Sequence, residues 1–233
     1  MVFVARRIDL LHAAIARAGG GFAIEADVCD TASRNRIPQE AAKALGRIDL
    51  FVYASGVSPL VRSRDVVDDD WSRVFKVNTF GAAQVFQACI PDMVDDGMFV
   101  YLSSDSVGKP RHGGMLYQAS KAAMEEALTV FRVENPNLRF LTLTVGATLG
   151  TEIAMDRDPE LQAEVAPEWV KRGLIGQNFM EAARLGELIV DVLAPMLDYS
   201  AAAVTQLRIE ASGAILEDVG TITRNQHSAA GRK

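Results

Sequence analysis

The sequence predicts a doubly wound α/β fold, in which a parallel sheet lies between two layers of helices. Two observations carry this prediction. Short apolar runs typical of strands alternate with longer segments of helical periodicity. One run, at 48–54, is almost continuously apolar, as a parallel strand covered on both faces requires. No repeat or linker-like change of composition divides the chain. We therefore expect one domain over 1–216 and a flexible polar tail over 217–233.

The N-terminal part of the chain predicts two strand–helix units and a third strand. The strands are expected at 1–5, 22–28 and 48–54, where Val, Ile and Phe are frequent. The helices are expected at 8–15 and 31–45, and Pro38 makes the middle of the second one the weakest part of the prediction. The three glycines at 19–21 lie between a helix and a strand. They indicate a helix end and a turn rather than a phosphate-binding loop.

The rest of the chain continues the alternation. The acidic residues at 68–70 suit the N-terminal end of a long helix that includes 71–89. The poorly periodic stretch 152–178 predicts a mobile flap with short helical pieces. The other expected elements are strands at 98–102, 139–145 and 203–209 and helices at 115–134 and 179–197.

The composition limits the possible partners. A formal net charge of −6 and a pI near 5.2 argue against a nucleic-acid partner. No apolar run approaches the ~20 residues that span a membrane, and no signal-peptide pattern opens the chain. Cys29 and Cys89 lie in apolar patterns, which predicts two buried free thiols and fits a reducing cytoplasm. The histidines 12, 112 and 227 are scattered, so we expect no metal site.

Tyr117 and Lys121 form the central chemical motif. Their spacing of four places both side chains on one face of a helix. Ser104 stands thirteen residues before Tyr117, at the end of an apolar run, and a glycine-containing loop lies between them. A phenol with a pKa of about 10 is a poor base at neutral pH, whereas a nearby ammonium favours the phenolate. Taken one at a time, these residues have a structural alternative: Tyr117 and Lys121 could be an ordinary amphipathic pair, and Ser104 a helix-capping serine.

This arrangement of strand, serine, loop and Y-x-x-x-K resembles the short-chain dehydrogenase/reductase family. Most of 1–216 can be laid on that family's pattern. The resemblance implies a Rossmann-like fold and an NAD(P)-dependent oxidoreductase that interconverts a ketone or aldehyde and an alcohol. It implies that Tyr117 is the general acid/base and that Lys121 activates it and binds the nicotinamide ribose. Ser104 would hold the carbonyl oxygen, and Asn78 would anchor a water that links Lys121 to solvent.

The resemblance also assigns contacts to the cofactor. Arg6 stands at the position that selects NADP, because a guanidinium can pair with a 2′-phosphate; NAD is the other possibility. Solvated surface charge is the alternative for this arginine. The segment 54–56 is Ala-Ser-Gly where the family usually has Asn-Ala-Gly, and the usual Pro-Gly opening is absent at 145–146. The expected cofactor residues are Arg6, Asp27, Val28, Ala54, Ser55, Gly56, Tyr117, Lys121, Gly146, Thr148 and Thr151.

One feature of the family's pattern is missing. None of the 18 glycines forms T-G-x-x-x-G-x-G or G-x-G-x-x-G, the loops that hold a pyrophosphate on backbone N–H groups. In the family, this loop and a central strand precede the segment that begins here at Met1. We therefore expect the first βα unit to be missing and the sheet to be interrupted. Three explanations are open. Met1 could be an internal codon of a longer enzyme, the protein could be a non-catalytic binding or scaffold protein, or it could be an inactive truncated product.

The remaining expectations concern the substrate and the assembly. A small carbonyl or alcohol substrate would be chosen by the loop 105–116, where His112 could line the entrance, and by the flap 152–178. The segments 71–90 and 115–133 resemble the helices with which the family forms dimers and tetramers. We therefore expect a cytoplasmic homo-dimer or homo-tetramer.

Overall fold

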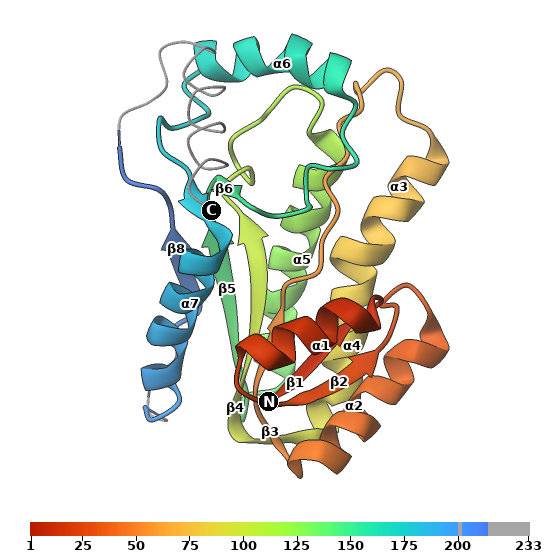
Figure 1. Ribbon diagram of the computed structural model, residues 1–233, viewed down its shortest axis with the longest axis vertical. Coiled ribbons are helices and arrows are strands. Elements are labelled where there is room, and N and C mark those ends of the chain that lie inside the picture. The colour runs from red at the N-terminus through yellow and green to blue at the C-terminus, as the bar shows by residue number, and fades with distance from the viewer. Residues whose placement is uncertain (200–201, 214–233) are drawn as a thin grey trace.

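The computed structural model describes residues 1–199 and 202–213, and all paired strands in this part of the chain run parallel (Figure 1). A four-stranded sheet has the order β3-β4-β5-β8. A two-stranded sheet joins β1 to β2, and a second short one joins β6 to β7. The bounds are β1 Val2–Ala5, β2 Phe22–Glu25, β3 Ile48–Tyr53, β4 Met93–Ser104, β5 Arg139–Val145, β6 Thr148–Leu149, β7 Met180–Glu181 and β8 Gln206–Ile209.

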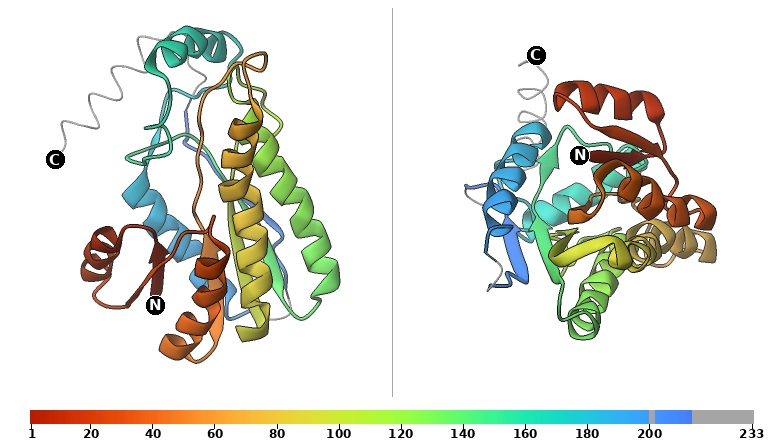
Figure 2. Two further views of the ribbon diagram at one scale, coloured as in Figure 1. Left: turned by 90° about the vertical axis from the view of Figure 1, so that its right-hand side faces the viewer. Right: turned by 90° about the horizontal axis from the view of Figure 1, so that it is seen from below.

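Helices cover both faces of the strands, which confirms the three-layer, Rossmann-like fold (Figure 2). On one side lie α2 (Thr31–Leu45), α4 (Ala82–Cys89) and α5 (Met115–Glu134). On the other lie α1 (Ile8–Arg17) and α7 (Ala182–Met196). The further helical segments are α3 (Asp68–Phe75), η1 (Lys76–Gly81), η2 (Ile90–Asp92) and α6 (Pro159–Lys171). Within the described ranges, no helix combines the length and apolar character needed to cross a membrane.

The expected interruption of the sheet is present. Among the described residues, β1 hydrogen-bonds to β2 alone and β3 to β4 alone, so each keeps one unpaired edge. The two sheets are nevertheless joined by one hydrophobic core, because Ile24 of β2 and Tyr53 of β3 belong to the same buried cluster.

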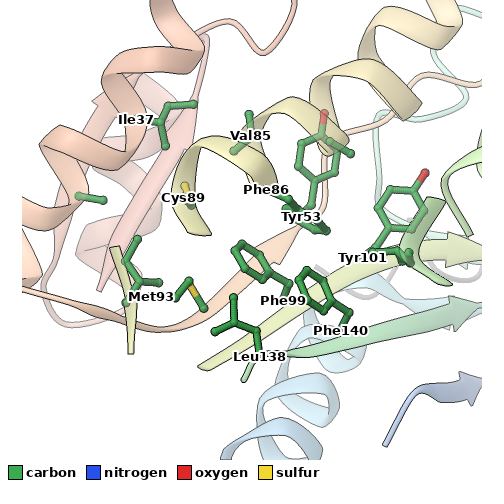
Figure 3. Close-up of a cluster of buried hydrophobic side chains, with 14 of the residues drawn as sticks. Ile37, Tyr53, Val85, Phe86, Cys89, Met93, Phe99, Tyr101, Leu138 and Phe140 are labelled. Carbon is green, nitrogen blue, oxygen red and sulfur yellow. The ribbon is translucent and has the colours of Figure 1, made fainter. Parts of the chain in front are cut away.

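Aromatic rings dominate this core (Figure 3). Phe99 of β4 stacks on Phe140 of β5 with ring centroids 5.1 Å apart, and Phe86 of α4 lies 4.7 Å from Phe99. The alternate residues Met98 and Val100 of β4 point to the opposite face and pack in the cluster that contains Leu193 of α7. The continuous apolar run of β4 thus packs in two cores, one on each face of the strand that ends at Ser104.

The long helix expected from residue 68 contains a π-helical segment, η1. Two phenols bond to its carbonyl groups: Tyr53 Oη donates to Val77 O at 2.6 Å, and Tyr101 Oη donates to Asn78 O at 2.8 Å. Gly81 allows the close approach of Tyr53, because a Cβ at residue 81 would lie 3.0 Å from Tyr53 Oη. Segments of this kind are frequent at functional sites.

Other predictions needed correction. Cys29 is exposed rather than buried, because β2 ends at Glu25 and residues 27–30 form a turn. The flap contains α6, a helix of 13 residues that starts at Pro159 with Asp158 as its N-cap, rather than short pieces. The helix expected at 31–45 is confirmed, and it continues through Pro38. The expected tail at 217–233 lies outside the described residues.

Candidate active site

Ser104, Tyr117 and Lys121 meet at the C-terminal end of β4. Ser104 is the last residue of that strand, and Tyr117 lies in the first turn of α5, which begins after the loop 105–114. The Ser104 hydroxyl lies close enough to the Tyr117 phenol to oppose the rise in the pKa of that phenol. One turn further along α5, Lys121 Nζ lies 5.8 Å from the centroid of the Tyr117 ring. The three residues that the sequence predicted to act together therefore lie close together in the folded chain.

Ser104 is oriented by a neighbour that the sequence did not single out. Ser106 Oγ donates to Ser104 Oγ at 2.9 Å, and the Ser106 N–H donates to the same oxygen at 3.2 Å. Both bonds use Ser104 as the acceptor. Its own hydroxyl proton is therefore available to Tyr117 or to a ligand oxygen.

Tyr117 has a pKa above that of a free phenol. Burial is the main cause of the increase. The hydrogen bond from Ser104 and the positive charges of Arg157 and Arg111 oppose it, and Asp105 adds to it. The strongest opposing influences therefore come from Ser104 and Arg157 and not, as the sequence led us to expect, from Lys121. The unliganded side chain is a neutral proton donor at neutral pH.

Lys121 is almost fully enclosed, with 3% of its surface exposed. Its Nζ donates to Leu102 O at 2.6 Å and lies 4.5 Å from the centroid of the Tyr101 ring. Burial lowers the pKa of this amine to about 7, and the Glu125 carboxylate only partly opposes the shift. The lysine therefore changes charge near neutral pH, which explains its weak influence on Tyr117.

Replacement of Lys121 by methionine is expected to remove a rise in stability with pH. The unfolded chain keeps this lysine protonated up to about pH 10, whereas the folded chain releases the proton near pH 7. Because the unfolded state then binds more protons, the wild-type free energy of unfolding should rise by about 1 kcal/mol per pH unit between about pH 7 and about pH 8.5. Urea unfolding at several pH values measures this slope.

Groups with the opposite sign limit that pH window. Burial raises the pKa of Cys89 to about 12 and also raises the pKa values of Tyr53 and Tyr101. The folded chain keeps these protons after the unfolded chain has released them, so stability falls again at higher pH. An equal slope for wild type and Lys121→Met would show that this lysine is not the group responsible.

Asn78 connects the loop after β3 to α5. Its Oδ1 accepts from Val57 N at 2.9 Å, and its Nδ2 donates to Val57 O and Ser120 Oγ, both at 2.9 Å. Gly56 lies against the same groups, because a Cβ there would be 3.5 Å from Asn78 Oδ1 and 3.7 Å from Lys121 Nζ. In the structure, Asn78 thus holds the loop after β3 against α5. The water expected to link Lys121 to solvent through Asn78 stays a prediction.

The residues expected at the adenosine end of the cofactor lie near the ends of β1 and β2. Arg6 and Asp27 line a cavity of about 530 Å³. Within the described part of the chain, Arg6 forms no ion pair, whereas Arg36, a cavity residue that sequence reasoning missed, pairs with Glu40 at 3.2 Å. Val28 is not among the lining residues, which are Arg6, Glu25, Ala26, Asp27, Ser33, Arg36 and Glu40.

The loop 146–151 follows β5, the neighbour of β4. The Gly146 N–H donates to Ile209 O at 2.9 Å, and Thr148 Oγ1 donates to Gly146 O at 3.0 Å. Thr151 is exposed, and the next residue, Glu152, forms an ion pair with Arg7. Ala54 and Ser55 are exposed in the loop directly after β3.

His112 lines a second cavity, of about 560 Å³, together with Arg62, Arg64 and Gln118. Its backbone carbonyl accepts from Trp169 Nε1 of α6 at 3.1 Å. The expected place of this histidine at the substrate entrance stays a prediction.

Comparison with known proteins gives a family match over most of the chain. Residues 1–162 match the family described as short chain dehydrogenase. An uncharacterized short-chain type dehydrogenase/reductase of Sinorhizobium fredii is 28% identical over 158 residues, which are 66% of this chain and 61% of that protein. The chain spans about half the length of the other curated relatives that it matches.

Solved structures share the fold. An alcohol dehydrogenase from Thermococcus sibiricus, complexed with 5-hydroxy-NADP, has a TM-score of 0.74 at 18% identity, covering 93% of this chain and 86% of that one. A short chain dehydrogenase from Burkholderia cenocepacia in complex with NADP also has a TM-score of 0.74, at 22% identity, covering 90% and 85%. At such identities the likeness concerns the fold.

Proposed function

The chain belongs to the short-chain dehydrogenase family, and on that premise we propose that it interconverts a ketone or aldehyde and an alcohol by hydride transfer. The observation that carries this proposal is the contact between Ser104 and Tyr117 at the end of β4, with Lys121 one helical turn away. This combination of an oriented hydroxyl donor and a protonated phenol suits a carbonyl oxygen that must gain a proton.

Each residue has a distinct part in this proposal. Tyr117 gives its proton to the oxygen of a ketone or takes one from an alcohol. Ser104, oriented by Ser106, donates a hydrogen bond to the same oxygen and so stabilises the negative charge that develops there. Lys121, whose pKa is close to neutral, exchanges the proton onward. A bound nicotinamide dinucleotide would supply or accept the hydride.

The chain's residues fit the adenosine end of such a nucleotide. The cavity beside β1 and β2 holds two guanidinium groups, and that of Arg6 has no ion pair in the described part of the chain. Bidentate contact with a phosphate is the characteristic use of arginine. At the other end, Gly56 leaves the space beside Asn78 and Lys121 free of a side chain of its own. The NADP-type ligands of the two solved structures support a nicotinamide dinucleotide, and Arg6 favours NADP over NAD.

Substitution of Arg6 by alanine is expected to weaken NADPH binding by about 10- to 100-fold, since a charge-assisted hydrogen bond contributes roughly 1.5–3 kcal/mol. Affinity for NADH, which lacks the 2′-phosphate, should change little. Arg7→Ala is the matched control, because Arg7 pairs with Glu152 and does not line the cavity. It should affect both nucleotides equally. Nucleotide fluorescence gives both affinities, and an equal loss of NADPH and NADH affinity in Arg6→Ala would contradict the assignment.

The same titration on the wild type tests the function itself. Binding of NADPH, followed by its oxidation in the presence of a ketone or aldehyde, is the expected result. A folded protein that binds neither nucleotide would instead favour the second candidate, a non-catalytic binding protein. The absence of a glycine-rich pyrophosphate loop among the 18 glycines supports that candidate.

The homo-oligomer expected from the sequence stays a prediction that the sedimentation mass would test. Exposed apolar side chains on α3, η1 and α5 favour it. They are Trp71, Phe80, Val130 and Val133.

A further inference from the structure

Arg157 is held beside the candidate active site by neutral partners. It lies in the flap between β6 and α6, where its Nε donates to Ser58 O at 3.0 Å and its Nη2 donates to Ser58 Oγ at 2.9 Å. Ser58 is buried and follows Gly56, the residue that approaches Lys121, by two positions. The guanidinium is thus bound at the rim that carries the catalytic residues.

The charge of Arg157 has no carboxylate partner in the part of the chain that the structure describes. Among the described residues, no carboxylate lies within ion-pair distance of this guanidinium. The chain neighbours Asp156 and Asp158 are exposed, and Asp158 caps α6. Asp105, beside Ser104, pairs with Arg111 at 2.8 Å.

Burial makes an unbalanced charge unfavourable. It lowers the pKa of Arg157, and the nearby positive charge of Arg111 lowers it further. Arg157 is partly buried, and withdrawing an ion from water without a partner lowers the stability of the folded chain. An anion from outside the protein would offset that cost.

Some donors of the Arg157 guanidinium remain for such an anion. A guanidinium carries five N–H groups. Ser58 accepts from one N–H group on Nε and from one on Nη2. This leaves both N–H groups of Nη1 and one of Nη2, and that end of the fork can form two parallel bonds to a carboxylate or phosphate.

Arg157 also acts on the catalytic phenol. Its positive charge is the largest charge effect that opposes the raised pKa of Tyr117. An anion bound by Arg157 would therefore lie close to the oxygen that receives the proton.

We propose that Arg157 binds an anionic group of the substrate, so that the substrate is an oxo or hydroxy compound bearing a carboxylate or a phosphate. This inference rests on the proposed oxidoreductase function and adds a substrate class to it. The anion supplies the counter-charge of Arg157 and orients the carbonyl towards Ser104 and Tyr117. Arg157 is then a specificity-determining residue carried by the flap.

The test compares 2-, 3- and 4-oxo acids and phosphorylated ketones with matched neutral compounds, the methyl esters of the acids and the unphosphorylated ketones, at saturating NADPH. For wild type, kcat/KM should favour an acid or a phosphate over its neutral counterpart by about 100-fold, as expected from about 2.7 kcal/mol of charge-assisted bonding. Arg157→Met should remove most of this preference, mainly through KM, and Arg157→Lys should restore part of it. Ser58→Ala removes an anchor of the side chain but keeps the charge, so the preference should persist.

Four outcomes are decisive. If Arg157→Met lowers kcat/KM equally for charged and neutral compounds, the residue only fastens the flap to the loop 54–58, and the inference is wrong although the oxidoreductase function stands. If no compound is turned over, the proposed function fails. Calorimetric titration of the oxo acids and phosphates then decides separately whether Arg157 binds an anion. Binding to wild type that is lost in Arg157→Met and partly regained in Arg157→Lys sustains the anion site, whereas binding that ignores these changes overturns it.

Discussion

Tyr117→Phe is expected to lower kcat by about 10³-fold or more while the affinity for NADPH stays within a few-fold of wild type. The substitution removes one hydroxyl and keeps the ring, so the packing of Lys121 against that ring is preserved. General acid–base catalysis contributes roughly 10²- to 10⁴-fold, and the Ser104 hydroxyl loses the phenol oxygen beside it as well. Steady-state turnover and nucleotide titration on the same preparation separate the two effects.

Tyr53→Phe is the matched control, because it removes the same group from another buried tyrosine. The Tyr53 hydroxyl donates to Val77 O in η1, so its loss should reduce stability by about 1–2 kcal/mol. Turnover should fall far less than in Tyr117→Phe. Full activity of Tyr117→Phe would remove Tyr117 from the mechanism, and a loss of nucleotide binding without loss of kcat would make it a binding residue.

Asn78→Leu is expected to lower the free energy of unfolding by about 3 kcal/mol. Asn78 is fully buried, and a leucine of similar size cannot replace its three hydrogen bonds. The N–H and C=O of Val57 would lose their partner, at roughly 1–3 kcal/mol for each group left unpaired. The midpoint of urea unfolding measures the loss.

Thr79→Val provides the comparison within the same π-helical segment. It removes a single bond, from Thr79 Oγ1 to Ser120 O at 2.8 Å, and should cost only about 1 kcal/mol. Equal losses in the two variants would mean that Asn78 is no more than an ordinary buried polar residue. A larger loss in Asn78→Leu, with reduced turnover, would confirm that it holds the loop 54–57 against α5.

Local patterns predicted the elements well. The apolar runs at 48–54 and 98–102 correspond to β3 and β4, and the expected helix at 31–45 has the observed bounds of α2. Side-chain alternation and helical periodicity follow from backbone geometry, so they are visible in a single sequence. For the same reason, a serine at a strand end and a Y-x-x-x-K pair on the next helix could be recognised before any contact was known.

Features that depend on distant contacts were missed or predicted wrongly. The segment η1 accepts hydrogen bonds from Tyr53 and Tyr101, which come from two different strands. The pKa of Lys121 falls to about 7 because the folded chain encloses the amine, whereas the sequence suggested a permanent ammonium. Cys29 lies in an apolar pattern but is exposed, because β2 ends before it.

The sequence alone therefore determined three features: the order of strands and helices along the chain, the family resemblance, and the spacing of Ser104, Tyr117 and Lys121. Each of them depends on residues that are near neighbours along the chain. Burial and charge balance were decided by the tertiary structure, since they depend on which distant segments meet. Arg157 is the clearest example: it meets Ser58 across 99 positions of sequence, and no local pattern in the flap distinguishes it from a solvated arginine. Desolvation makes its unpaired charge unfavourable, and this cost exists only in the folded chain.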